Sequence, residues 1–513
     1  MSLVRPADPS KLYTLGSNSE NSGSDKINFK NGANQYFRDS YNQHYFSDSP
    51  TEETCPSNSD SIVTENSFNS YQPHSVSEYL NVPDNELIDY DDDDIRLKLQ
   101  ELERELLNDN DENDDDSMDI DCEWAHSIEN LALPNSSKQP LTSKELLFDC
   151  ASSISDGNME EASISIRKLR QMVSIQGDPP QRIAAYMVEG LAARMAASGQ
   201  GIYRALKCKE PPASDRLSAM QILFEICPCF KFGFMAANGA IAEAFKNEER
   251  VHIIDFDINQ GSQYITLIQA LGTRPGKPPH MRITGVDDPE SVQRVIGGLK
   301  VIGQRLEQLA KSVGMPFEFQ ALATKTEDVT PSMLNCQPNE AIVVNFAFQL
   351  HHMPDESVST VNQRDQLLRM VKSLEPKLVT VVEQDVNTNT APFFPRFVEA
   401  YNYYSAVFES LDATLPRESL DRMNVERQCL ARDIVNIVAC EGVERIERYE
   451  VAGKWRARMT MAGFKSYPLS PYVNGTIKIL LKQYCDKYKV KEEGGSLHFG
   501  WADKILIVAS AWK

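Results

Sequence analysis

The stretch VHIIDFDINQGSQYITLIQAL, residues 251–271, decides the fold because it joins a strand to a helix through a tight turn. The apolar run from Val251 to Phe256 predicts a buried strand. After the turn around Gly261, apolar residues recur at helical spacing, namely Tyr264, Ile265, Leu267, Ile268 and Leu271. A strand, a turn and a helix in this order open a nucleotide-binding fold, so the turn is the first place to look for a cofactor site.

Apolar strands and helices continue to alternate after this stretch. Candidate strands lie at 251–256, 281–286, 317–321, 341–346, 378–383 and 505–509. Candidate helices lie at 264–271, 291–312, 361–374 and 393–411. The rhythm predicts an α/β fold with a Rossmann-like, doubly wound core, in which helices cover both faces of a mostly parallel sheet. In that plan a ligand binds at the carboxyl ends of the strands.

The turn lacks the glycines that a cofactor site needs. A dinucleotide-binding turn carries three spaced glycines, whereas this one has Gly261 alone. Compared with the acid-x-Gly-x-Gly-x-Gly turn of S-adenosylmethionine-dependent methyltransferases, Asp257 and Asn259 replace two glycines between Asp255 and Gly261. Asp257 places a carboxylate on the cofactor's path, so we interpret the turn as structural, with Asn259 able to adopt positive φ. Asp287, which ends the second candidate strand, keeps a small-molecule-binding protein or methyltransferase open as the alternative.

Two other polar clusters follow candidate strands, but neither completes a known catalytic motif. His351 and His352 follow IVVNFAFQL, and Glu383, Gln384 and Asp385 follow KLVTVV. Neighbouring histidines are expected to point apart, unlike the two histidines of H-E-x-x-H, which share a helix face. The ten cysteines show no C-x-x-C pairing, and neither a nucleophile elbow nor a phosphate-binding loop occurs. We therefore predict no catalytic residues, no metal ligands and no bound cofactor.

Residues 1–140 differ sharply in composition from the rest of the chain. They hold 30 Asp and Glu against 9 Lys and Arg, whereas the remaining 373 residues hold 44 against 43. Few aliphatic side chains accompany this charge, so we expect a disordered acidic region. Within it, IRLKLQELERELL at 95–107 predicts a short amphipathic helix. This helix either binds a partner or, within a solvated acidic spacer, merely packs back on the domain, and composition does not separate the two.

Residues 141–246 predict an all-helical cap with a leucine-rich region. Thr142 and Glu145 form a capping-box pattern before an apolar helical stripe. Strand patterns begin only after this region, so we divide 141–513 into the cap and an α/β core at 247–513. No stretch reaches the roughly 18 apolar residues of a membrane span, and the N-terminus lacks an apolar signal-peptide core. We therefore expect a soluble intracellular protein with no membrane partner.

Basic residues gather in VERIERYEVAGKWRARM at 443–459. The cations of this segment are Arg445, Arg448, Lys454, Arg456 and Arg458. Glutamates are interleaved with them, so the charge pattern favours a salt-bridged helix face over a DNA-binding groove. The alternative is that the five cations bind phosphates locally.

Longer blocks resemble the ordered signature motifs of the plant GRAS family. VHIID follows the helical region, PFFPRFVEAYNYYSAVFESLDATLPRE occupies 392–418, and FGWADKILIVASAWK closes the chain at 499–513. The resemblance covers the chain from about Leu141 to Lys513. It places one motif, VHIID, on Val251, His252, Ile253, Ile254 and Asp255. It places a second, PFYRE-like motif on Pro395, Phe397, Tyr404, Arg417 and Glu418, and a third, SAW, on Trp501, Ser510, Ala511 and Trp512.

The resemblance implies a non-enzymatic transcription regulator in the plant nucleus, with a methyltransferase-like core and a helical cap. It implies action mainly through other transcription factors and GRAS proteins, as homodimers or heterodimers, with DNA reached directly or through those partners. Most of the motif residues also fit a plain structural role, since apolar strand positions and tryptophans fill cores. We therefore expect the motifs to mark the fold rather than contacts, and a buried His252 to be hydrogen-bonded.

Overall fold

The structure is a computed structural model, and the residues it describes are 141–196, 214–289 and 298–513. The expected disordered region at 1–140, with its helix at 95–107, lies outside these residues, as does the start of the helix expected at 291–312. Among the described residues, no helix combines the length and the apolar character that a membrane crossing requires.

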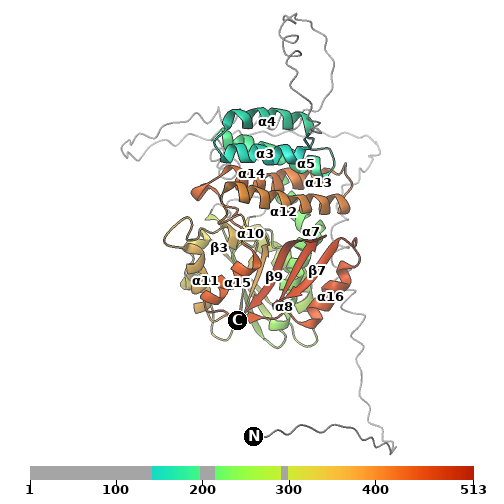
Figure 1. Cartoon of the computed structure of the whole chain (residues 1–513). Coiled ribbons are helices and arrows are strands. Elements are labelled where there is room, and N and C mark those ends of the chain that lie inside the picture. Colours follow the sequence, from blue (N-terminus) through green and yellow to red (C-terminus); the bar gives the residue numbers. More distant parts are fainter. Residues whose placement is uncertain (1–140, 197–213, 290–297) are drawn as a thin grey trace, which may run out of the picture. The chain divides into compact units, whose positions relative to one another are not determined.

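A nine-stranded sheet forms the centre of the described part of the chain (Figure 1). Its strands are β1 (Arg250–Asp255), β2 (His280–Asp287), β3 (Phe317–Ala323), β4 (Ala341–Ala347), β5 (Leu378–Gln384), β6 (Ser466–Tyr467), β7 (Tyr488–Glu493), β8 (Ser496–Trp501) and β9 (Lys504–Trp512). They follow the order β3-β2-β1-β4-β5-β9-β8-β7, and β6 pairs with β9. The first five are parallel to one another, and the order reverses between β1 and β4. That reversal is the topological switch point, where folds of this class bind ligands.

Helices precede, separate and follow these strands. The α-helices are α3 (Ser143–Ser155), α4 (Met159–Met172), α5 (Pro179–Met195), α7 (Ser214–Ile226), α8 (Pro228–Ala244), α9 (Gln263–Gly272), α10 (Leu299–Ser312), α11 (Gln363–Ser373), α12 (Phe393–Thr414), α13 (Leu420–Val425), α14 (Ala431–Ala439), α15 (Ala452–Met461) and α16 (Pro471–Leu481). Short 3-10 turns occur at η2 (Thr326–Asp328), η3 (Pro331–Leu334), η4 (Leu350–His352) and η6 (Gly442–Glu444). The capping box predicted at Thr142 is confirmed, because its side chain accepts the Glu145 N–H while Glu145 accepts the Thr142 N–H.

Helices cover both faces of the sheet, which confirms the doubly wound, Rossmann-like prediction. On one face α8 packs against β5 and β9, and α10 packs against β3. The approach of α8 is close, since a Cβ on Gly233 would lie 2.8 Å from a methyl of Val382 on β5. On the other face α11 and α15 contribute side chains to one apolar cluster with β1, β4 and β5.

The sheet departs from the prediction at its C-terminal edge. The last candidate strand becomes β9, which runs antiparallel to β5, and β8 and β7 extend the sheet in the same antiparallel manner. Sequence periodicity missed β7 because its segment YKVKEE is largely exposed and charged. Such charges are usual on an edge strand, where they discourage pairing with another chain.

A layer of helices lies beyond the carboxyl ends of the parallel strands, and it draws on both halves of the chain. Helices α3 and α5 pack against α12 and α14, which follow β5 in sequence, and α4 packs on the outer side of α3 and α5 (Figure 1). Buried Arg182 of α5 joins them, with 3.0 Å to Glu426 and 2.9 Å to Asp412. Arg422 also pairs with Glu426, at 2.7 Å. Because α8 lies on the sheet instead, the expected division at residue 246 does not separate the helical layer from the core in space.

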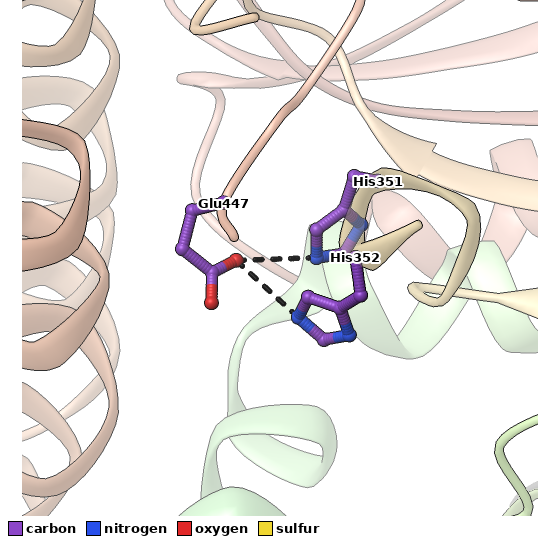
Figure 2. Close-up of side chains that lie close together, drawn as sticks. All are labelled: His351, His352 and Glu447. Carbon is purple, nitrogen blue, oxygen red and sulfur yellow. Dashed lines mark ion pairs between the residues drawn. The ribbon is translucent and has the colours of Figure 1, made fainter. Parts of the chain in front are cut away.

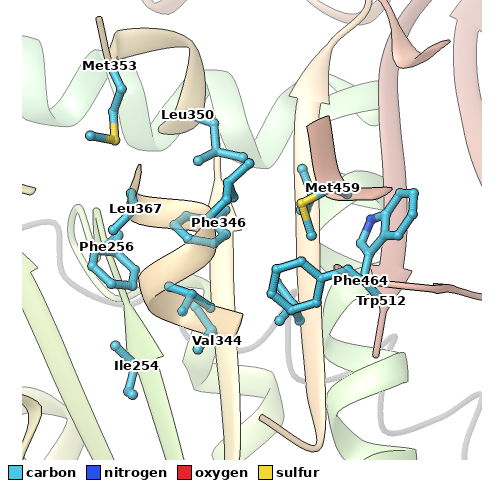
Figure 3. Close-up of a cluster of buried hydrophobic side chains, with 14 of the residues drawn as sticks. Ile254, Phe256, Val344, Phe346, Leu350, Met353, Leu367, Met459, Phe464 and Trp512 are labelled. Carbon is cyan, nitrogen blue, oxygen red and sulfur yellow. The ribbon is translucent and has the colours of Figure 1, made fainter. Parts of the chain in front are cut away.

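The apolar cluster beneath α11 and α15 holds the sheet together. Ile254 of β1, Val344 of β4 and Trp512 of β9 lie in it, and all are almost completely buried (Figure 3). Val251 and Ile253 are buried with no exposed surface on the opposite face of β1, beneath α8 and α9. The apolar residues of VHIID therefore serve the core, as their pattern predicted.

Replacing Ile254 by Ala should lower the free energy of unfolding by about 2–5 kcal/mol, because it removes buried methyl and methylene groups and leaves a cavity. The matched control is Ile479→Ala on α16, where the side chain is 54% exposed. That change should cost less than about 0.5 kcal/mol. Urea denaturation of both variants measures the difference, and equal losses would contradict the burial described for Ile254.

Candidate functional site

Asp255 ends β1, and its carboxylate is held by side chains from two other elements. Its Oδ2 accepts hydrogen bonds from the Tyr264 hydroxyl of α9 and, at 3.0 Å, from Asn345 Nδ2 of β4. Its Oδ1 accepts the N–H of Asp257 at 2.9 Å, which closes the turn. Burial raises the pKa of Asp255, and these hydrogen bonds oppose the rise. Protein side chains thus satisfy the carboxylate at the switch point, where a cofactor would otherwise contact it.

His252 belongs to a separate, structural network deeper in the sheet. Its Nδ1 lies 3.0 Å from the guanidinium of Arg282, and its Nε2 lies 2.7 Å from Thr284 Oγ1. Burial, followed by the charge of Arg282, lowers the pKa of His252 to about 4, so the ring is neutral. Nδ1 then accepts from Arg282, and Nε2–H donates to Thr284. The expectation that buried His252 is hydrogen-bonded is confirmed.

The turn after β1 contains two residues with positive φ, and only one of them is a glycine. Asn259 has φ 52° and Gly261 has φ 69°, so the positive φ predicted for Asn259 is confirmed. A Cβ at Gly261 would lie 2.9 Å from Ile302 of α10, so this glycine permits helix packing. Asp257 is partly buried, and burial, followed by the charges of Asp287 and Asp255, raises its pKa to about 7.

A cavity of about 100 Å³ lies between the carboxyl ends of the central strands and the helical layer. Residues that follow β1, β4 and β5 line one side, and α7 and α12 line the other. Its aromatic lining includes Phe224, Phe230, Phe348, Tyr403, Tyr404 and Tyr449. Its charged and polar lining includes Asp257, His351, His352, Gln384 and Glu447. The cavity is smaller than the roughly 300–1,000 Å³ typical of pockets for drug-sized ligands.

Two irregular backbone features lie at this cavity. Phe348, directly after β4, has φ 58°, which is uncommon for a residue with a bulky side chain. Its ring stacks on Phe224 of α7 with centroids 5.5 Å apart. A π-helical turn, η5 (Glu426–Leu430), contributes Cys429 and Leu430 to the opposite wall. Strained residues and π-helical turns concentrate at functional sites, so both features mark the cavity as the candidate site.

His351 and His352 converge on Glu447 at the wall of the cavity (Figure 2). The Nε2 atoms of both histidines lie 3.3 Å from Glu447 Oε2. The other ring nitrogen of His351, Nδ1, lies 2.7 Å from Glu383 Oε2 at the end of β5. The prediction that the two histidines point apart is wrong, because the 3-10 turn η4 brings both rings to one carboxylate. Burial alone lowers the pKa of His351, but Glu383 and Glu447 together raise it to about 9.

The residues of the PFYRE-like motif do not form one site. Pro395 is exposed in the first turn of α12, and Phe397 is fully buried within the helical layer. Tyr404 lines the cavity, and it is the member of the motif that belongs to the candidate site. Arg417 and Glu418 are exposed between α12 and α13. The motif thus combines core, cavity and surface positions.

The SAW motif serves the sheet. Trp501 of β8 is buried, and its Nε1–H donates to Glu409 of α12 at 3.0 Å. Trp512 Nε1–H donates to Ser510 Oγ at 3.0 Å while its ring packs in the apolar cluster. Ala511 is buried between them on β9. These contacts tie β8 to α12 and place Trp512 of β9 in the apolar cluster shared with β1, β4 and β5.

The basic segment is salt-bridged, as predicted, but it does not form one helix face, because Arg445 and Arg448 precede α15, which begins at Ala452. Arg458 is nearly buried and pairs with Glu450 at 2.6 Å and with Asp355 at 2.9 Å. Lys454 also approaches Glu450, at 3.8 Å. These contacts support a salt-bridged arrangement rather than a DNA groove.

The sequence analysis correctly placed a candidate site at the carboxyl ends of the strands, but it did not predict the cavity. Phe224, Phe348 and Glu447 lie more than 90 residues apart in sequence, so no local pattern links them. The signal that could have found the site is the position of His351 and Glu383 at the ends of the adjacent strands β4 and β5.

The fold is a doubly wound sheet beneath a helical layer, and VHIID forms its first strand. The sequence matches a known family along nearly all of the described chain. The GRAS domain family model matches residues 143–513, and the chain belongs to this family.

Named relatives agree with this membership. The chain is 56% identical to Scarecrow-like protein 1 of Arabidopsis thaliana, over 100% of this chain and 98% of that protein. It is 52% identical to Scarecrow-like transcription factor PAT1 of Arabidopsis thaliana, over 82% of this chain and 86% of that protein. The crystal structure of SCL7 in Oryza sativa superposes with a TM-score of 0.63 at 32% identity, covering 73% of this chain and 100% of that one. Together the family and these names support a role in plant transcription regulation.

Replacing Asp257 by Asn should change stability in a pH-dependent way. Because the pKa of Asp257 is raised to about 7 in the fold, its contribution to stability falls as pH rises from about 4 through 7. Asn removes the buried charge, so relative to wild type the variant should gain roughly 2–3 kcal/mol between pH 5 and pH 8. Urea denaturation at the two pH values measures this gain. A variant that loses relative stability at pH 8 would contradict the assignment.

Proposed function

We propose that this chain is a nuclear transcription regulator of plant development and signalling that acts through other transcription factors and GRAS proteins, and not as an enzyme. Family membership and the relatives' names support the regulatory role. The observation that carries the non-enzymatic part is the switch point, where Tyr264 and Asn345 hold Asp255 in place of a cofactor.

The outer helices of the helical layer offer a surface for such partners. On α4, Met159, Ile164 and Met172 are each more than 40% exposed. Exposed apolar side chains mark protein interfaces when they belong to a contiguous patch. We propose that α4 contributes to the binding of a second GRAS protein, as a homodimer or a heterodimer.

A small-ligand function is the second candidate, and the cavity favours it. Phe348 and the π-helical turn place irregular backbone around a partly polar space at the carboxyl ends of the strands. Its volume of about 100 Å³ suits an ion or a small fragment rather than S-adenosylmethionine. Methyl transfer is therefore the weaker form of this candidate.

Replacing Ile164 by Asp on α4 should lower the recovery of a second, differently tagged copy of the chain from plant nuclei by several-fold. A charge at the centre of an apolar contact is desolvated without a partner. Ile479→Asp on α16 is the matched control, since that side chain is also exposed. Equal recovery with the two variants, both with the wild-type melting temperature, would contradict a role for α4.

A further inference from the structure

The cluster at the cavity wall has the composition of a metal site. It combines two imidazole nitrogens and one carboxylate, whose ligand atoms all lie within 4.8 Å of one another. Two histidines and one glutamate are the protein ligands of several catalytic zinc sites, in which the fourth position is left to water or a ligand. His351 and Glu447 are buried and His352 is 36% exposed, so the group opens toward the cavity that it lines.

The two contacts with Glu447 match the spacing of ligands around a tetrahedral ion. A charge-assisted N–H···O bond measures about 2.7–2.9 Å. His351 Nδ1 makes such a contact with Glu383, at 2.7 Å, whereas both contacts with Glu447 are 3.3 Å. Ligands bound about 2.0–2.1 Å from a tetrahedral metal are separated by about 3.3–3.4 Å, while an octahedral ion of the same bond length brings adjacent ligands to about 3.0 Å.

Neighbouring residues orient the ligands in the manner of known metal sites. The Nδ1–H of His351 donates to Glu383, which leaves Nε2 directed at the space near Glu447. Glu383 is itself fixed by the N–H of Leu350 at 2.8 Å. The hydroxyl of Tyr449 donates to Glu447 Oε2 at 2.8 Å. A carboxylate behind a ligating histidine and a hydrogen bond to a ligating carboxylate are the usual outer contacts of a metal site.

Charge balance is compatible with a bound ion. Glu383 and Glu447 bring two buried carboxylates to this cluster, and in the absence of an ion they are balanced by protons on His351 and His352. A divalent cation with two neutral histidines neutralises both. Because imidazole binds a metal only without its proton, the ion takes the place of the proton on His351 Nε2.

We propose that His351, His352 and Glu447 bind a divalent transition-metal ion, with Zn²⁺ as the ion that fits best, and that Glu383 is a positioning residue for His351. This site departs from the expectation, drawn from sequence, that the chain has no metal ligands. It is independent of the proposed regulatory function. The remaining coordination position faces the cavity and is available to water or to a small ligand with an oxygen or nitrogen donor.

The test uses Co²⁺ as a spectroscopic probe and Zn²⁺ as its competitor on the full-length chain after chelator treatment. Co²⁺ should produce the intense visible absorption of a tetrahedral complex, and one equivalent of Zn²⁺ should abolish it. His352→Ala should remove this spectrum and lower Zn²⁺ stoichiometry by one equivalent, as measured by calorimetry. Glu383→Gln should keep the stoichiometry but weaken Zn²⁺ binding by about 10–100-fold, because the histidine loses its charged acceptor.

The matched control is His280→Ala, since His280 begins β2 at the opposite end of the strands. It should retain the wild-type spectrum, stoichiometry and affinity. Melting temperatures in chelator confirm that each variant is folded, and the partly exposed position of His352 makes that variant the one least coupled to the core. Equal Zn²⁺ binding by wild type and His352→Ala, or a weak octahedral Co²⁺ spectrum, would overturn the proposal.

Discussion

The buried carboxylate of Asp255 is the interaction on which the architecture around the switch point depends. A carboxylate removed from water must be hydrogen-bonded, or its burial destabilises the fold by several kcal/mol. Tyr264, Asn345 and the backbone of Asp257 meet that demand from α9, β4 and the turn. Because α9, β4 and the turn all donate hydrogen bonds to the Asp255 carboxylate, these bonds hold the turn after β1 in place. The position that a cofactor occupies in related folds is thereby used for structure.

Protein side chains fill the switch point, so the candidate site lies further out, between the strand ends and the helical layer. Helices from both halves of the chain lie over the strand ends and are fastened by the buried pairs of Arg182 with Glu426 and Asp412. The cavity lies beneath this layer, with Phe348 and His352 in its wall. A scaffold of a nucleotide-binding kind can thus retain a small, partly polar cavity at the expected edge of its sheet.

Local sequence patterns predicted the elements whose structure depends on residues close together in the sequence. The parallel strands and the capping box at Thr142 follow from periodicity and capping chemistry, and both are confirmed. The antiparallel strand β7 was missed because its exposed, charged segment has no apolar alternation. Strand β8 was missed although it is buried, because Ser, His and Gly interrupt the apolar residues of SLHFGW. The candidate site depends on residues such as Phe224 and Glu447, which tertiary contacts alone bring together. The orientation of His352 was likewise wrong, since a 3-10 turn and not a strand sets it.

Calorimetric titration of S-adenosylmethionine into the full-length chain is the most direct test of the claim that the switch point is closed. The turn carries Asp257 on the cofactor's path, and the adjoining cavity measures about 100 Å³. We predict no saturable heat above that of dilution. Saturable binding in the micromolar range would contradict the claim if it is lost when Asp257 is replaced by a bulkier residue. That result would support a cofactor-binding function instead.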